Sequence, residues 1–222
     1  SMYGTRDAAQ NWEYAYSEFM ISVGFIRGQG SPCVFYHPSK NIRAVIHGDD
    51  FTMLAEEKNL DWFRKVMTEK FEVKFRGRLG PEKGDDKSIR ILNRIVQWDD
   101  QGISYEADQR HAEIIIQELE MHHYSSVTSP GIKIKPNECT DEELSELPAK
   151  EASKYRALVA RANYLAQDRS DIRYAVKSLA RWMSKPRHLD YQCLIRLGRY
   201  LKGAPRVVNK FNYQKEWKIL DV

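Results

Sequence analysis

The sequence predicts an α+β fold in which helices pack on one face of an antiparallel sheet. Apolar and polar residues alternate through residues 42–47 and 51–55, on both sides of a Gly-Asp pair, which is typical of a β-hairpin. Amphipathic helical patterns precede and follow this hairpin, at residues 7–23 and 56–71. Three more helical patterns fill residues 151–202. This order indicates an α+β layer followed by a mainly helical region.

The composition sets few limits on function. A chain of 222 residues forms one large domain or two small ones. Its net charge of +4 permits nucleic-acid binding without requiring it, because such binding depends on Lys and Arg gathered on one face. Cys33, Cys139 and Cys193 include no CxxC pair, so we expect reduced thiols and neither a disulfide framework nor a zinc site. We find no charged-then-apolar leader and no apolar run long enough to cross a bilayer.

The first helix is expected over residues 7–23, with Asp7 as its cap and Gly24 ending it. Trp12 and Phe19 lie on its apolar stripe and are interpreted as core residues. No room for a folded unit precedes the first motif, so we interpret the abrupt start as a cut. A strand over residues 33–37 is expected to follow the helix.

The hairpin is predicted to present two carboxylates at its tip. A type II′ turn needs positive φ at its first central residue, which glycine adopts without steric cost, so Gly48 and Asp49 are expected to be the central residues. Asp49 and Asp50 then stand together where two strands end. Adjacent unpaired carboxylates repel each other, and protonation, a basic partner or a bound cation relieves that repulsion. Mg²⁺ takes a few carboxylates together with waters and substrate phosphates, so this pair is a candidate metal site.

The alternative for this pair is an ordinary turn, because Asp is a common turn former. Two further pairs, Asp85-Asp86 and Asp99-Asp100, lie beside glycines and are interpreted as solvated loop or turn residues. Only the pair at residues 49–50 is enclosed by apolar strands on both sides, which favours the metal interpretation there.

A second sheet region is expected after the helix at residues 56–71. Residues 72–77 read as a strand, and the polar loop at residues 79–88 marks the predicted subdomain boundary. Residues 89–108 alternate as two strands around the Asp-Asp-Gln-Gly turn, with the pair Leu92-Asn93 inside the first strand.

Helices dominate the remaining sequence. One is expected over residues 110–121, with His122 and His123 at its end, where cations complement the helix dipole, so neither is assigned a ligand role. Residues 125–148 are predicted to be a long loop with one helical turn. Three helices follow, at residues 151–167, 171–184 and 188–202.

The polar faces of these three helices are rich in Arg and Lys. If the faces align, they form a basic wall suited to a sugar-phosphate backbone; the alternative is a solvated charged surface. The residues concerned are Lys154, Arg156, Arg161, Arg173, Lys177, Arg181, Lys185, Arg196, Arg199 and Lys202.

Several blocks resemble the reverse transcriptase of copia-type LTR retrotransposons. The catalytic turn of that family is Tyr-Val-Asp-Asp, and the matching stretch here is His47-Gly48-Asp49-Asp50. An upstream family block, close to Leu-Tyr-Gly-Leu-Lys-Gln-Ala-Pro-Arg-Ala-Trp, resembles MYGTRDAAQNW through Tyr3, Gly4, Ala8 and Trp12, with Arg6 in place of lysine. Gly24-Phe25, Pro32-Cys33-Val34-Phe35, YRALVARANYLAQDRSDIRYAVKSLARWMSKP at residues 155–186 and RYLKG at residues 199–203 are also similar to family blocks in order and spacing.

The resemblance implies an RNA-directed DNA polymerase, a nucleotidyltransferase that uses two Mg²⁺ or Mn²⁺ ions held by three carboxylates. Asp49 and Asp50 match two of these carboxylates and are the implied catalytic and metal-binding residues, whereas the third would precede Met2. The implied substrate-binding residues are Tyr3, Gly4, Arg6, His47 and Gly48, and a solvated helix-end charge is the alternative for Arg6. The implied partners are an RNA or DNA template with its primer, deoxynucleoside triphosphates and the rest of a Pol polyprotein (fingers, RNase H and integrase), with no membrane.

The resemblance also implies a domain order. The C-terminal half of the palm would cover residues 1–80, a primer-grip-like hairpin with the first thumb helix 81–124, a loop 125–150, a helical thumb or connection 151–203, and the start of a truncated RNase H domain 204–222. Trp98 and Tyr105 are implied near the primer, with core packing as the competing account for both. The implied nucleic-acid contacts of the helical part are Arg156, Arg161, Arg173, Lys177 and Arg181.

Two departures from the family lie at the site itself, where His47 replaces tyrosine and Gly48 replaces valine. Because the first carboxylate and the fingers are missing, we expect this chain to be inactive alone. The alternatives are a catalytically dead remnant that only binds nucleic acid or protein, and a structural domain whose basic helices contact nothing. The expected setting is intracellular, in a cytoplasmic retroelement particle or in the nucleus.

Overall fold

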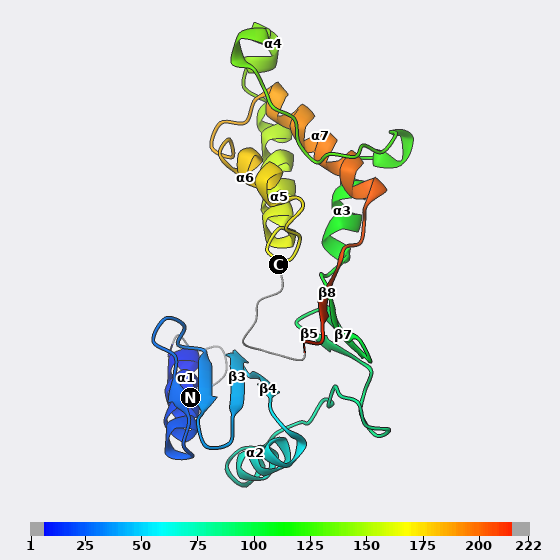
Figure 1. Cartoon of the computed structure of the whole chain (residues 1–222). Coiled ribbons are helices and arrows are strands. Elements are labelled where there is room, and N and C mark those ends of the chain that lie inside the picture. Colours follow the sequence, from blue (N-terminus) through cyan, green and yellow to red (C-terminus); the bar gives the residue numbers. More distant parts are fainter. Residues whose placement is uncertain (1–6, 215–222) are drawn as a thin grey trace. The chain divides into compact units, whose positions relative to one another are not determined.

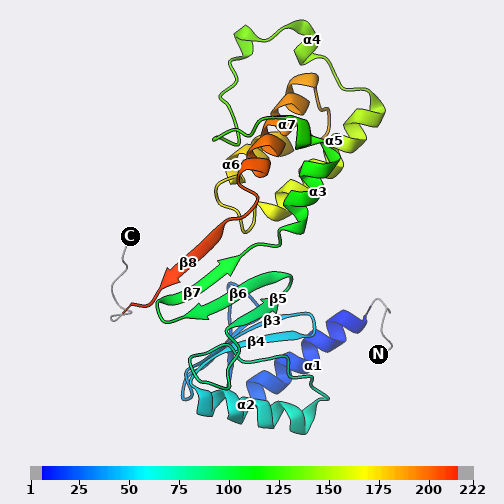
Figure 2. The ribbon, with the colours of Figure 1, turned by 90° about the vertical axis from the view of Figure 1, so that its right-hand side faces the viewer.

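The computed structural model describes residues 7–214 and divides the chain into two compact units (Figures 1 and 2). The first unit is Ser1–Arg76 and the second is Gly77–Val222, so the division falls between Arg76 and Gly77. Within the described residues, no helix combines the length and the apolar character needed to span a membrane.

The first unit is a four-stranded antiparallel sheet backed by two helices, as the hydrophobic pattern predicts. In Figure 2, both helices lie on the same side of the sheet. The strand order is β1-β2-β3-β4, and every neighbouring pair is antiparallel. The elements are α1 (Ala8–Ser22), β1 (Ile26–Arg27), β2 (Val34–His37), β3 (Ile42–His47), β4 (Asp50–Leu54) and α2 (Glu57–Lys70).

The core of this unit lies between the sheet and the helices. Ile42, Ala44 and Ile46 of β3 are buried and alternate with exposed residues, so one face of the sheet packs on the helices and the other is open. The other buried apolar residues are Tyr16, Met20, Phe25, Phe35, Phe63 and Met67. The α+β layer is therefore confirmed for this unit.

The first helix ends as predicted but begins without the expected cap. Gly24 has φ +100°, its N–H donates to the carbonyl of Ile21, and the N–H of Phe25 donates to the carbonyl of Met20, which is a Schellman motif. Asp7 occupies the N-cap position but makes no side-chain capping hydrogen bond, since its backbone is already helical.

The strand predicted over residues 72–77 is wrong. This segment has no regular structure, and Val73 and Phe75 are 42% and 48% exposed. Alternation of apolar residues does not make a strand unless another strand supplies backbone hydrogen bonds, and this segment has no such partner among residues 7–214.

The second unit combines a second four-stranded sheet with a helical bundle. Its strand order is β5-β6-β7-β8, and each neighbouring pair is antiparallel. The strands are β5 (Ser88–Ile91), β6 (Arg94–Asp99), β7 (Gly102–Glu106) and β8 (Val208–Asn212). The helices are α3 (Arg110–Glu118), α4 (Asp141–Leu144), α5 (Ala149–Leu165), α6 (Arg173–Ala180) and α7 (His188–Gly203), with single 3-10 turns at Met121–His123 and Pro136–Glu138.

Residues 89–108 were predicted as two strands, but they contribute to three. Leu92 and Asn93 have φ +48° and +66° and connect Ile91 to its cross-strand partner Arg94, so they form a type I′ hairpin turn rather than part of a strand. Asn is a common residue in such turns, but Leu is not. The apolar Leu92 therefore fitted the alternating pattern, and the sequence predicted one continuous strand through this position. The second turn is as predicted, and Asp99 Oδ1 accepts the N–H groups of Gln101 and Gly102.

The helical bundle has its own core. Strand β7 leads into α3 and α7 leads into β8, so the two strands and the two helices form adjacent continuous arms (Figure 2). The helix predicted to reach residue 121 ends instead at Glu118, because Glu120 adopts a left-handed conformation with φ +55°. The fully buried residues include Tyr155, Val159, Ile172, Leu194, Leu197 and Leu201.

Candidate functional site

The acidic pair lies at the tip of the hairpin in the first unit. His47 pairs with Asp50, so Gly48 and Asp49 are the two turn residues, as predicted. Gly48 has φ +62° whereas Asp49 has no positive φ, which is the pattern of a type II′ turn. A Cβ at Gly48 would meet no atom within 4 Å, so backbone conformation and not space favours glycine there.

The two carboxylates are accessible and only partly neutralised. Asp49 is exposed, and the side chain of Asp50 is 40% exposed. Asp50 Oδ1 lies 3.6 Å from a guanidinium nitrogen of Arg76, whose side chain is 75% exposed, so this ion pair is solvent-screened and weak. Cross-strand partners share a face, so Asp50 lies with exposed His47 on the open face of the sheet.

These residues fit part of a magnesium site. Mg²⁺ is usually held by one or two carboxylates and completed by waters and substrate phosphates, so two accessible carboxylates on a fixed turn are a suitable donor pair. Among the described residues, no group of three or more His, Cys, Asp or Glu side chains could hold a metal ion. A further ligand would have to come from the substrate or from another part of the polypeptide.

The turn is tied to the first helix. The indole N–H of Trp12 donates to the carbonyl oxygen of Gly48 at 2.9 Å. The ring of Trp12 packs edge-on against Tyr16, Phe51 and Phe71, with centroid distances of 5.7, 6.4 and 5.3 Å. Trp12 is therefore a partly buried residue packed against the core, and it also makes a polar contact with the turn. Three other implied substrate-binding residues, Tyr3, Gly4 and Arg6, lie outside the described residues.

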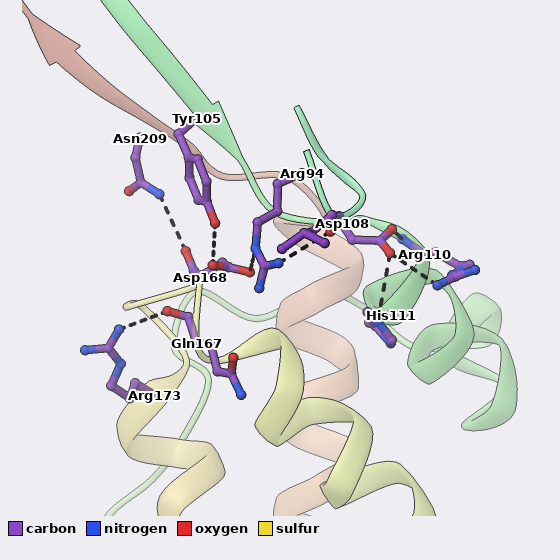
Figure 3. A network of polar contacts seen from close by, with 10 residues as sticks. Arg94, Tyr105, Asp108, Arg110, His111, Gln167, Asp168, Arg173 and Asn209 are labelled. Atoms are coloured by element: carbon purple, nitrogen blue, oxygen red, sulfur yellow. Dashed lines mark hydrogen bonds and ion pairs between the residues drawn. The ribbon is translucent and has the colours of Figure 1, made fainter. Parts of the chain in front are cut away.

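Tyr105 is part of a polar network in the second unit (Figure 3). Its hydroxyl donates to Asp168 Oδ1 at 2.5 Å, and Arg94 Nε donates to Asp168 Oδ2 at 2.8 Å. The Asn209 amide also reaches the Asp168 carbonyl oxygen, at 3.5 Å. Burial, followed by the hydrogen bond to Asp168, raises the pKa of Tyr105 to about 12. This network fastens the sheet to the end of α5.

Trp98 is held by a lysine. Lys87 Nζ lies 4.8 Å from the centroid of the Trp98 ring, within the range of a cation–π contact. The same ammonium donates to the carbonyl oxygens of Gly80, Pro81 and Glu82 at 2.7, 2.9 and 3.0 Å. Both aromatic residues assigned to the primer therefore have partners within their own unit.

The basic residues of the helices divide into two groups. Arg156 donates to the carbonyl oxygens of Met183 and Ser184, just beyond α6. Arg173 donates to those of Ala166 and Gln167, just beyond α5. These two side chains therefore supply hydrogen bonds to carbonyl groups that follow the helices. Arg161 lies 3.3 Å from His111 Nδ1. Lys177 on α6 and Arg181, its C-cap, are exposed and make no hydrogen bond or ion pair within residues 7–214, so they remain available to a partner.

Buried ion pairs in the second unit were not anticipated from the sequence. Arg169 is 1% exposed, donates twice to Asp171 at 2.7 and 2.9 Å, and donates again to the carbonyl oxygens of Ala204 and Pro205. Asp190 is also buried, where it accepts the backbone N–H and the guanidinium of Arg187. The short spacing of these partners, two or three residues, is the one sequence signal that could have indicated them.

Comparison with known proteins points to a retroelement. No family model matches the chain, and no solved structure matches it. The chain is similar to a retroelement Pol polyprotein, which indicates a Pol origin. That relative is the retrovirus-related Pol polyprotein from transposon TNT 1-94 of Nicotiana tabacum, 24% identical over 218 residues. The similarity covers 92% of this chain but 15% of the relative.

Proposed function

We propose that this chain is part of an RNA-directed DNA polymerase of a copia-type retrotransposon, spanning the second half of the palm and the thumb. The observation that carries the proposal is an Asp-Asp pair at the end of a β-hairpin in a helix-backed antiparallel sheet. The similarity to a Pol polyprotein, over nearly the whole chain, supports the same assignment.

In this proposal, Asp49 and Asp50 hold Mg²⁺ or Mn²⁺. When bound, such ions promote attack by the primer 3′ hydroxyl and stabilise the charge that develops on the triphosphate. The residues of this chain supply the fixed support: the buried alternate residues of β3 fix the strand, and Gly48 permits the turn. Arg76 partly neutralises Asp50 in the absence of the ion. His47, on the same open face, is placed beside the substrate.

The helical part is proposed to contact the duplex through α6. Tyr174 is 81% exposed, and Lys177 and the C-cap residue Arg181, whose backbone is still helical, follow it at positions i+3 and i+7, so the three side chains form one stripe. Phosphate contacts by this stripe would be independent of nucleic-acid sequence. Replacing Lys177 and Arg181 by Ala should therefore weaken duplex binding for all sequences and reduce its salt slope by about 2.

Primer extension by a longer chain tests the catalytic proposal. A polypeptide that also contains the preceding segment of the Pol reading frame should extend a primer on an RNA template, whereas the 222-residue chain alone should not. Asp49→Asn and Asp50→Asn should each abolish extension. The matched control is Asp85→Asn with Asp86→Asn, an acidic pair in a loop, which should leave extension unchanged. Extension by the Asp49→Asn or Asp50→Asn chain would refute the assignment.

The second candidate is a catalytically dead remnant that retains duplex binding. It is favoured by the two departures at the turn, His47 and Gly48, which stand where the resembling family has tyrosine and valine. A longer chain that fails to extend a primer but is retained on a duplex at low salt, and released at high salt, would support the remnant instead.

A further inference from the structure

The contact between Trp12 and the turn reaches one particular peptide group. In a two-residue hairpin turn, the carbonyl oxygen of the first central residue belongs to the peptide that joins the two central residues. Here that oxygen is Gly48 O, and it accepts the Trp12 indole N–H at 2.9 Å, across 36 residues of sequence. The orientation of the peptide between Gly48 and Asp49 is therefore fixed by a side chain from α1.

That orientation decides the turn type. Type I′ and type II′ turns both have positive φ at the first central residue, and they differ in the sign of φ at the second, which reverses when the joining peptide rotates. Glycine followed by aspartate permits either turn, because Asp tolerates positive φ better than most residues. Asp49 has no positive φ here, in agreement with type II′. The local sequence favours type II′ without excluding type I′, so a contact from elsewhere can strengthen that preference.

The donor itself has little freedom. The partly buried Trp12 ring contacts three aromatic rings, all edge-on, from the same helix, from β4 and from the end of α2. These contacts restrict the orientation of the indole, so the hydrogen bond needs less further ordering of the side chain.

We infer that Trp12 is a positioning residue for the acidic pair: its indole N–H selects the type II′ turn and thereby sets the direction in which Asp49 leaves the hairpin. Its effect on metal binding rests on the proposed function, whereas its effect on the turn does not. Without this hydrogen bond the turn should populate both types, and the two carboxylates should spend less time in the arrangement that shares one ion.

The first test uses nuclear magnetic resonance on the full chain. The amide protons of Gly48 and Asp49 lie far apart in a type II′ turn and close together in type I′. Trp12→Phe keeps an aromatic ring in place and removes the donor, so a contact between these two protons should appear in this variant and be absent from the wild type. The matched control is Trp62→Phe. Trp62 lies in α2 and packs on His37 of β2, and its indole makes no hydrogen bond within residues 7–214.

Hydrogen exchange on the wild type provides a second test, which does not depend on how the variants fold. The indole N–H of Trp12 should exchange with water more slowly than that of Trp62. Equal exchange rates, or an unchanged pattern of amide contacts in a folded Trp12→Phe chain, would overturn the inference.

Mn²⁺ binding separates this inference from the proposed function. Trp12→Phe should weaken Mn²⁺ binding about fivefold, the factor that corresponds to one hydrogen bond of about 1 kcal/mol, and Trp62→Phe should not. If Asp49→Asn with Asp50→Asn binds Mn²⁺ as well as the wild type does, the metal site is wrong, and the amide contact still decides the role of Trp12. If the double variant loses binding but Trp12→Phe does not, the metal site stands and Trp12 does not position it.

Discussion

The carboxylates of the two units differ in how fully their charges are compensated. In the first unit, Asp49 is exposed and Asp50 has one long contact, 3.6 Å, to an exposed Arg76. In the second unit, Asp171 accepts two bonds from buried Arg169 and a third from the hydroxyl of Tyr200. Both kinds of carboxylate lie next to regular structure, but Asp171 accepts several charged or hydroxyl donors.

This difference separates structural charges from available ones. Buried carboxylates persist only when paired, and breaking the pair leaves a charge without compensation. The hydrogen bonds from Arg206, with those from Gln109, hold the pKa of Glu106 below its ordinary value, despite its burial. Among residues 7–214, the pair at the hairpin tip has no such set of donors and is fixed by backbone instead. It is therefore free to bind a partner without loss of fold.

The largest effect that would sharpen this contrast comes from Arg169. Arg169→Ala removes both bonds to Asp171 and two bonds to backbone carbonyls, so it should destabilise the second unit by about 3–5 kcal/mol. Urea unfolding followed by circular dichroism measures this. Lys177→Ala, an exposed cation on α6, should change stability by less than about 0.5 kcal/mol. Equal losses of stability for the two variants would contradict the distinction between structural and available charges.

The next effect concerns Tyr105. Tyr105→Phe should cost about 1.5–3 kcal/mol near neutral pH, because the hydrogen bond to charged Asp168 is lost. The pKa of Tyr105 is raised in the fold from 10.0 to about 12, so its stabilisation is complete below pH 10 and is lost as the pH rises through 12. Unfolding at a series of alkaline pH values should show the wild type and the variant converging. Tyr174→Phe, at an exposed tyrosine, should show no such convergence.

A smaller effect is expected at Glu106. Glu106→Gln should cost about 1 kcal/mol at pH 7, since the Gln amide has one acceptor oxygen for the two donors of Arg206 and carries no charge, while the largely exposed Arg206 can still be hydrated. The pKa of Glu106 is lowered in the fold, so the stabilisation is present above the ordinary value of 4.5 and is lost as the pH falls through the lowered one. Urea midpoints that remain apart at acid pH would contradict this account.

The smallest effect is expected at the hairpin tip. Asp49→Asn with Asp50→Asn should change the free energy of unfolding by no more than about 0.5 kcal/mol, because neither charge is buried and the ion pair with Arg76 is screened by solvent. The same urea titration serves as the measurement. A loss above about 1 kcal/mol would mean that the pair is structural, like the carboxylates of the second unit.

Local sequence was sufficient for much of the fold. Strict alternation predicted β3 and β4, and the Gly-Asp pair predicted the turn at residues 48–49, because glycine adopts the positive φ that such turns need. Helical periodicity located α1, α2, α5 and α7 to within a few residues. The rules failed at Leu92, because leucine is uncommon at positive φ, and the two-residue connection between β5 and β6 holds it at φ +48°.

The candidate site was only partly predictable. The position of Asp49 and Asp50 at a turn follows from nearby residues, and their role in catalysis stays a prediction. The contact between Trp12 and Gly48 spans 36 residues, and that between Arg94 and Asp168 spans 74. Such pairs depend on how whole elements pack, so periodicity and turn chemistry carry no information about them.

The pairing of β8 with β7 bears on how this polypeptide can be shortened. Val208–Asn212 lies in the stretch that family resemblance gives to a following nuclease domain, yet it contributes the outermost strand of the sheet in this unit. Ending the polypeptide at Ala204 would strip β7 of five paired residues and leave its backbone N–H and C=O groups bare along one side. Because those β7 groups would lose the hydrogen-bond partners that β8 supplies, the shortened protein should unfold at a lower urea concentration than one ending beyond Asn212.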